Sequence, residues 1–202
     1  YSHAFDDPAC QANASFAKWL GGWASRAKVS YYDYPPMGPN WKVPTVLTHS
    51  LKKHLASLKK TGVIGLAGEN QGDWGGSALY HYLEARLLWD IDTDVDKLVK
   101  EFCRDMYGPA APAMESFYHA FEQKLPEFSV SGQTGQLSGH VAYRVVYFTD
   151  KDTIQTLQDF LEQARQQADS PLVQKRVKLM QVAMDCFVVQ VKADRARSEA
   201  AK

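Results

Sequence analysis

The sequence lacks an excess of charge of either sign and contains few cysteines. Its 202 residues include 23 Lys and Arg against 23 Asp and Glu, so the formal net charge is zero. Basic residues never cluster in more than two consecutive positions, which argues against a nucleic-acid-binding protein. The three cysteines, Cys10, Cys103 and Cys186, are far apart and lack metal-ligand spacing, so we expect no disulfide framework.

Long apolar runs are also missing. No run approaches the roughly 18 residues that cross a bilayer, so we expect no membrane partner. No secretory signal is visible, and because the first residue is Tyr1 rather than Met, we expect further residues to precede it. Apolar residues nevertheless make up 45% of the chain and aromatic residues 12%, which is enough for a substantial core.

The first ninety residues alternate between helix-like and strand-like segments. Apolar residues spaced three and four apart predict helices over 7–27, from 47 to a cap at Gly62, and over 77–89. Short β-branched or apolar runs predict strands over 29–34 and 63–67. This alternation is typical of βα units around a parallel sheet. Since a whole (β/α)8 barrel needs about 250 residues, the chain has room for only a piece of one.

Beyond residue 90 the pattern changes to one helix after another. Apolar stripes predict four helices, which cover residues 95–106, 114–125, 154–164 and 170–191. Residues 141–148 fit a strand or an extended segment. We therefore predict an α/β fold with two domains: βα units over residues 1–90 and a helical bundle over residues 91–202.

Polar and aromatic side chains gather directly after the two predicted strands. The first loop carries Asp33 between Tyr32 and Tyr34, with Trp41 further on. The second loop carries Glu69, Gln71, Asp73 and Trp74. Because the carboxyl ends of parallel strands meet at one edge, we expect these residues to share a site. Carboxylates and amides bind sugar hydroxyls, and flat rings cover the apolar face of a pyranose, so the site suits a carbohydrate.

Asp33 and Glu69 are the candidate catalytic pair in this site. In glycoside hydrolysis one carboxyl group protonates the leaving oxygen while the other attacks or activates the nucleophile. The alternative interpretation is structural: Asp33 caps a turn, Glu69 caps the glycine-rich loop, and Trp74 packs under a helix. Both interpretations stay open at this point. We expect no metal ion and no other cofactor.

The acidic residues between 90 and 101 have the spacing of a calcium-binding loop, but the position that requires Gly is Val95. We predict instead a helix start with Thr93 as N-cap and Asp96 completing a capping box. The scattered histidines are interpreted as surface or packing residues. The basic residues of the last helix, interrupted by Asp185, are interpreted as a solvated face.

Several short motifs lie between residues 13 and 112. They include Leu87-Leu88-Trp89-Asp90, Tyr107-Gly108-Pro109-Ala110-Ala111-Pro112, and the opening Phe16-Ala17-x-Trp19-Leu20-x-x-Trp23. Together they resemble the C-terminal part of a bacterial family long labelled as a domain of unknown function. That family lies among α-glucuronidase-like and hexosaminidase-like glycoside hydrolases, and some members are endo-β-N-acetylglucosaminidases that act on N-glycans.

The resemblance implies that residues 1–90 are the last βα units of a (β/α)8 barrel and that the protein is secreted or periplasmic. It also implies that the acid/base and its partner carboxylate lie on earlier strands. Asp33, Tyr34, Glu69 and Trp74 would then bind the sugar. We therefore predict part of a glycoside hydrolase that acts on glycans containing N-acetylglucosamine or glucuronic acid. The alternatives are a non-catalytic carbohydrate-binding module and a helical scaffolding module.

Overall fold

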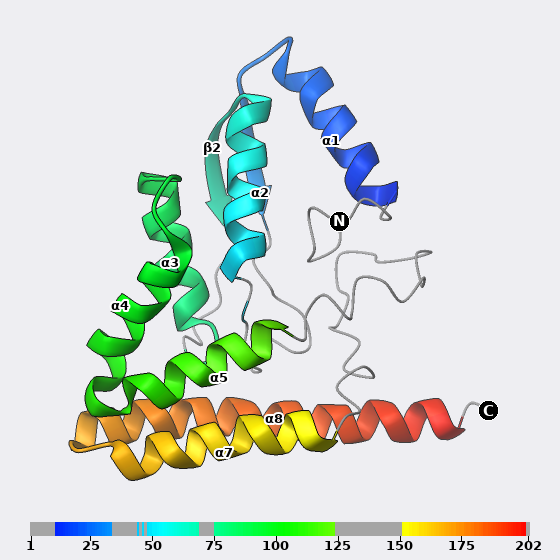
Figure 1. The fold of residues 1–202 in the computed structure, drawn as a ribbon. Coiled ribbons are helices and arrows are strands. Elements are labelled where there is room, and N and C mark those ends of the chain that lie inside the picture. The colour runs from blue at the N-terminus through cyan, green and yellow to red at the C-terminus, as the bar shows by residue number, and fades with distance from the viewer. Residues whose placement is uncertain are drawn as a thin grey trace.

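The structure is a computed structural model that describes residues 11–33, 44, 46, 48–68, 75–123 and 151–200. Over these residues the chain is mostly helical and contains a small parallel sheet (Figure 1). The N-terminal elements are α1 (Gln11–Ala24), β1 (Val29–Asp33), α2 (Thr48–Thr61), β2 (Val63–Gly68) and α3 (Ala78–Trp89). The elements that follow are α4 (Val95–Tyr107), the 3-10 helix η1 (Gly108–Ala110), α5 (Ala111–Gln123), α7 (Lys151–Gln167) and α8 (Pro171–Ala200).

The two strands form the predicted parallel pair, with α2 between them in the chain. The ring of Tyr31 in β1 packs edge-on against Phe16 of α1 and His54 of α2, each at a centroid distance of 5.6 Å. Both helices therefore cover the same face of the sheet. α2 ends before Gly62, whose φ of 94° is the left-handed conformation that the sequence predicted there. The mixed α/β character is confirmed, whereas a closed barrel stays a prediction.

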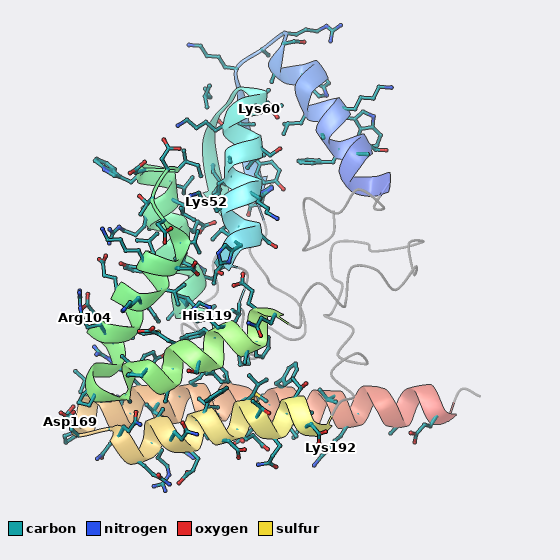
Figure 2. The ribbon with its side chains drawn as sticks, viewed as in Figure 1. Lys52, Lys60, Arg104, His119, Asp169 and Lys192 are labelled. Carbon is teal, nitrogen blue, oxygen red and sulfur yellow. The ribbon has the colours of Figure 1, made fainter. Side chains whose placement is uncertain are left out.

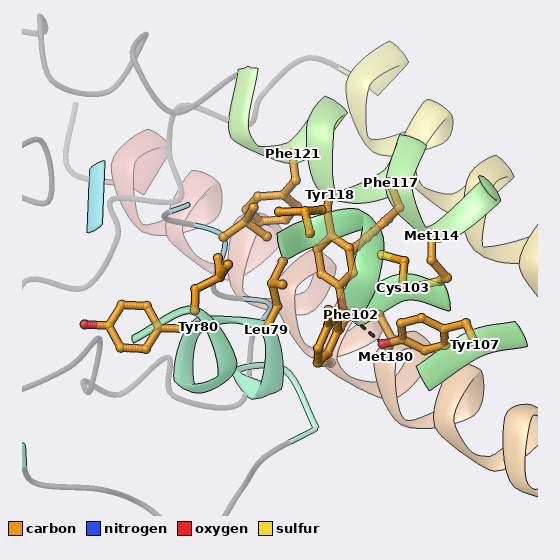
Figure 3. Packing of buried hydrophobic residues seen from close by; sticks show 14 of the residues in the cluster. Leu79, Tyr80, Phe102, Cys103, Tyr107, Met114, Phe117, Tyr118, Phe121 and Met180 are labelled. Carbon is orange, nitrogen blue, oxygen red and sulfur yellow. Dashed lines mark hydrogen bonds between the residues drawn. The ribbon is translucent and has the colours of Figure 1, made fainter. Parts of the chain in front are cut away.

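The helices after residue 90 stack into a bundle. α7 and α8 lie side by side, α5 crosses them, and α4 connects this layer to α3 (Figure 1). Aromatic rings link the layers: Phe102 of α4 packs on Tyr118 of α5 at 6.2 Å (Figure 3). Phe121 of α5 packs on Phe187 of α8 at 5.5 Å. The buried side chains form one cluster that extends from β1, α2 and α3 to α8.

The turn between α3 and α4 corrects one detail of the sequence analysis. Asp94, not Thr93, is the N-cap of α4, and its carboxylate accepts a hydrogen bond from the Lys97 N–H at 2.8 Å. The hydroxyl of Thr93 instead donates to Asp90 at 3.0 Å. Asp90 also accepts the backbone N–H of Asp92, and these two hydrogen bonds lower the pKa of its carboxyl group. The acidic residues therefore shape a turn and a helix start.

A polar network on the outside of the protein joins α3 to α4. Arg86 and Tyr82 of α3 both donate to the same Glu101 oxygen of α4, at 2.7 Å and 2.9 Å. The hydrogen bond from Arg86 is the main reason why the pKa of Glu101 lies below its usual value, and the bond from Tyr82 adds to it.

The predicted extended segment over 141–148 lies outside the described residues. Among the helices that are described, none has the length and apolarity needed to cross a membrane.

Candidate functional site

The two strands end side by side. In the register of the sheet, Tyr32 pairs with Ala67 and Asp33 pairs with Gly68. Neighbouring strands lie about 4.8 Å apart, so the polypeptide leaves the sheet at two adjacent points. Glu69 follows Gly68 directly in the chain. The two polar loops that the sequence singled out therefore depart from the same edge of the sheet.

Tyr32 is the predicted site residue whose side chain the structure describes. It is 57% exposed, and because side chains alternate along a strand, it lies on the face opposite to Tyr31 and the covering helices. Only the backbone of Asp33 is described. The other predicted site residues lie outside the described residues, and their roles stay predictions: Tyr34, Trp41, Glu69, Gln71, Asp73 and Trp74.

The sequence analysis missed a carboxylate that reaches this end of the sheet from α5. Glu122 accepts a hydrogen bond from the Thr48 hydroxyl. It also accepts two hydrogen bonds from His49, one from the backbone N–H at 2.9 Å and one from the ring Nδ1 at 3.1 Å. Figure 1 shows the end of α5 close to the start of α2. A helix begins with unpaired N–H groups and a partial positive charge, so a carboxylate there stabilises it. Glu122 thus fixes the start of α2 from 73 residues away.

His49 also joins α2 to α4. Its Nε2 atom lies 3.6 Å from Asp96, while its Nδ1 atom contacts Glu122, so the imidazole ring lies between two carboxylates. The sequence analysis interpreted His49 as a surface or packing residue and named neither partner. No sequence pattern could have identified Glu122, because the contact exists only after α5 has packed near α2.

A second polar pair lies on α3, directly after the glycine-rich loop. The Nδ1 atom of His81 is 4.0 Å from a carboxylate oxygen of Glu84, and both side chains are largely buried. The interpretation of His81 as a packing residue agrees with its burial, and Glu84, three positions further along the same helix, is a neighbour that the sequence analysis did not name. At this separation the two atoms are within ion-pair distance but beyond hydrogen-bond distance. The i, i+3 spacing was the sequence feature that could have revealed it.

Other chemistries find less support in the part of the chain that the structure describes. That part holds no group of three or more His, Cys, Asp or Glu residues able to bind a metal ion. The thiol of Cys103 is fully buried, and burial raises its pKa, so the group is protonated at neutral pH and is a poor nucleophile. The edge formed by the ends of β1 and β2 is therefore the best-supported location for a site.

The Glu122 contact gives a stability prediction. Replacing Glu122 with alanine should lower the free energy of unfolding by about 1–2 kcal/mol, because α2 loses its cap. Glu122→Gln, which retains an acceptor oxygen, should lose less. Urea denaturation followed by far-UV circular dichroism measures both variants, and Glu199→Ala at the exposed end of α8 is the matched control. If Glu122→Ala and Glu199→Ala lowered the free energy of unfolding equally, the Glu122 cap would not contribute to stability.

The described elements define a mixed α/β protein in which βα units pack against a bundle of helices. Over residues 1–119 the sequence matches the family described as a domain of unknown function (DUF4838), and the chain belongs to this family. The predicted membership of a family of unknown function is thereby confirmed. No curated protein and no solved structure matches the chain.

Proposed function

We propose that this chain forms part of the sugar-binding pocket of a (β/α)8-barrel glycoside hydrolase. The substrate is a glycan that contains N-acetylglucosamine or glucuronic acid. The observation that carries the proposal is the pairing of Asp33 with Gly68, because the two loops that are rich in carboxylates, amides and aromatic rings begin directly after these paired residues. In barrel enzymes the site is built from such loops at the carboxyl ends of the strands.

A difference between the two faces of the sheet supports the barrel part of the proposal. α1 and α2 contact the ring of Tyr31 on one face of the sheet. The opposite face carries the exposed ring of Tyr32. In a closed barrel that opposite face turns toward the interior, and residues near its upper rim contact the substrate. An aromatic ring at this position is suited to stacking on a pyranose.

In this proposal the roles follow from side-chain chemistry. Tyr32, Tyr34, Trp41 and Trp74 provide rings for the apolar face of the sugar, while Gln71 and Asp73 bind its hydroxyl groups. Asp33 and Glu69 are the carboxylates nearest to the reacting centre. Where the substrate carries an N-acetyl group, the acetamide can serve as the internal nucleophile, and a carboxylate then needs only to orient it.

The test is an assay of the full chain, in the form that the cell makes, on three substrates. Aryl glycosides of N-acetylglucosamine and of glucuronic acid report simple cleavage, and a complex N-glycan reports endo-type cleavage. We expect Glu69→Gln to reduce kcat/KM at least about tenfold, which corresponds to the loss of one charge-assisted contact in the transition state. Asp33→Asn should behave in the same way.

The matched control is Asp169→Asn. Asp169 is an exposed carboxylate at the turn between α7 and α8, far from the strand ends (Figure 2). Its substitution should leave kcat/KM unchanged. Glycan binding without turnover by the wild type would instead favour a carbohydrate-binding module. If the wild type neither bound nor cleaved any of the three substrates, the proposal would be rejected and a scaffolding role favoured.

A further inference from the structure

Helix α8 carries two apolar faces, and only one of them belongs to the core. The inner face repeats at alternating spacings of four and three residues, as in a helix packed along its length against others. Its members are all buried: Val173, Val177, Met180, Met184, Phe187 and Val191. Figure 1 shows this helix running along α7 and extending beyond it.

The outer apolar stripe, as we call the second face, lies on the opposite side of α8. At about 100° per residue, it is displaced by nearly half a turn from the inner face. Its positions repeat at seven-residue intervals in two interleaved rows: one row is Leu172, Leu179 and the half-buried Cys186, and the other is Lys175, Val182 and Val189. Its four large side chains are substantially exposed: Leu172 (56%), Leu179 (48%), Val182 (47%) and Val189 (66%).

This stripe changes the interpretation of the last helix. The predicted solvated basic residues Lys175, Lys178 and Lys192 are exposed, and four large apolar side chains that the sequence analysis did not single out are exposed beside them. One of the basic residues is also not free in solvent: Arg176 donates to the backbone carbonyl of Met106 at 3.0 Å, at the end of α4. Exposed apolar side chains in one row, rather than scattered singly, mark an interaction surface.

We propose that the outer apolar stripe is a homodimer interface, in which α8 packs antiparallel against α8 of a second copy. Two residues per heptad make a narrow seam, which fits a partner helix better than it fits a membrane surface, where a broad apolar face is needed. A two-fold axis lets one stripe serve both copies. The inference depends on α8 alone and is independent of the proposed function.

The apolar positions and the charges select one register. With the two-fold axis between Met180 and Gln181, Leu179 faces Val182 of the second copy, and Leu172 faces its Val189. The same axis places Lys178 beside Asp185 of the second copy. By symmetry, Asp185 of the first copy then lies beside Lys178 of the second copy, on the other side of the two-fold axis. Both side chains are exposed in one copy, where Asp185 accepts a hydrogen bond from Gln181 of its own helix.

Other arrangements bring like charges together. Moving the axis by half a heptad would set Asp185 against Asp185 of the second copy and Lys178 against its Lys192. A parallel pairing would align Lys175 with Lys175 of the second copy inside the seam. Like charges in contact across a helix pair are unfavourable, so the antiparallel register centred near residue 180 is the one that the sequence permits.

The first experiment measures the mass of the full chain in solution by sedimentation at micromolar to tens-of-micromolar concentration. We expect the wild type at twice its monomer mass, and Leu179→Lys with Val182→Lys at the monomer mass. Far-UV circular dichroism should not change, because both side chains are exposed in the single copy. Leu88→Lys, which alters an exposed leucine of α3, is the matched control and should remain dimeric.

The second experiment tests the register by exchanging charges. Lys178→Asp and Asp185→Lys each create two like-charge contacts, so each should weaken the dimer at least about tenfold. The combined variant restores opposite charges and should recover most of the wild-type affinity. A monomeric wild type, or a dimer that survives the two lysines in the stripe, would overturn the interface. A combined variant as weak as the single variants would overturn the register.

Discussion

Replacing Phe117 with alanine is expected to lower the free energy of unfolding by about 3–5 kcal/mol. The Phe117 side chain is fully buried, and its ring packs against Tyr118 at 5.5 Å and against Phe121 at 6.0 Å (Figure 3). Removing the ring leaves a cavity, and the neighbouring aromatic side chains are too rigid to fill it. The loss should therefore lie well above that of an average substitution.

Urea denaturation at constant protein concentration measures this effect. Leu88→Ala is the control, because Leu88 is an exposed apolar residue on α3, and its substitution should change the free energy by no more than about 0.5 kcal/mol. Phe117→Leu keeps much of the buried volume and should fall between the two. Equal losses for Phe117→Ala and Leu88→Ala would mean that α5 is not packed as described.

The second large effect involves two buried hydroxyl groups. The Tyr107 and Tyr118 hydroxyl oxygens are 2.9 Å apart and form a hydrogen bond within the core (Figure 3). Burial raises the pKa of both phenols, so both remain neutral at physiological pH. Tyr107→Phe or Tyr118→Phe alone should lower the free energy of unfolding by about 1–3 kcal/mol, because the remaining hydroxyl loses its partner without regaining water.

Combining the two substitutions distinguishes this cause from a general loss of packing. The double variant removes both polar groups, so its free energy of unfolding should be at least as high as that of the less stable single variant. A double-mutant cycle based on urea denaturation gives the coupling free energy between the two residues directly. Strictly additive losses would show that the hydroxyl pair is not coupled in the folded protein.

Much of the fold could be predicted from the sequence because the pattern is strong. The first strand is a β-branched and aromatic run shortly before Pro35, the second is an apolar run that follows Gly62, and the helical stripes have regular spacing, so the predicted positions agree with the described elements. The start of α4 was predicted less well. Thr93 and Asp94 are both good N-caps, and the choice depends on Asp90, which binds the Thr93 hydroxyl and leaves Asp94 to cap the helix.

Of the candidate site, the structure describes where the two polar loops begin, and the roles of its residues stay predictions. The pairing of the strand ends follows from the alternation of helices and strands, and the register of Asp33 with Gly68 agrees with it. The contact between His49 and Glu122 joins residues 73 positions apart, and no local pattern encodes it. The outer apolar stripe of α8 was not predicted either, because the inner face alone is sufficient to explain a helix packed in the core.

The carboxylate of Glu122 has a consequence for how the protein can be divided. A fragment ending at residue 90 would leave the first turn of α2 with unsatisfied N–H groups in place of a cap. It would also uncover Leu83 and Leu87, which are buried in the cluster that continues into the bundle. The βα units and the bundle therefore stabilise each other. A substitution that displaces α5 in the bundle should also displace the start of α2, which Glu122 caps.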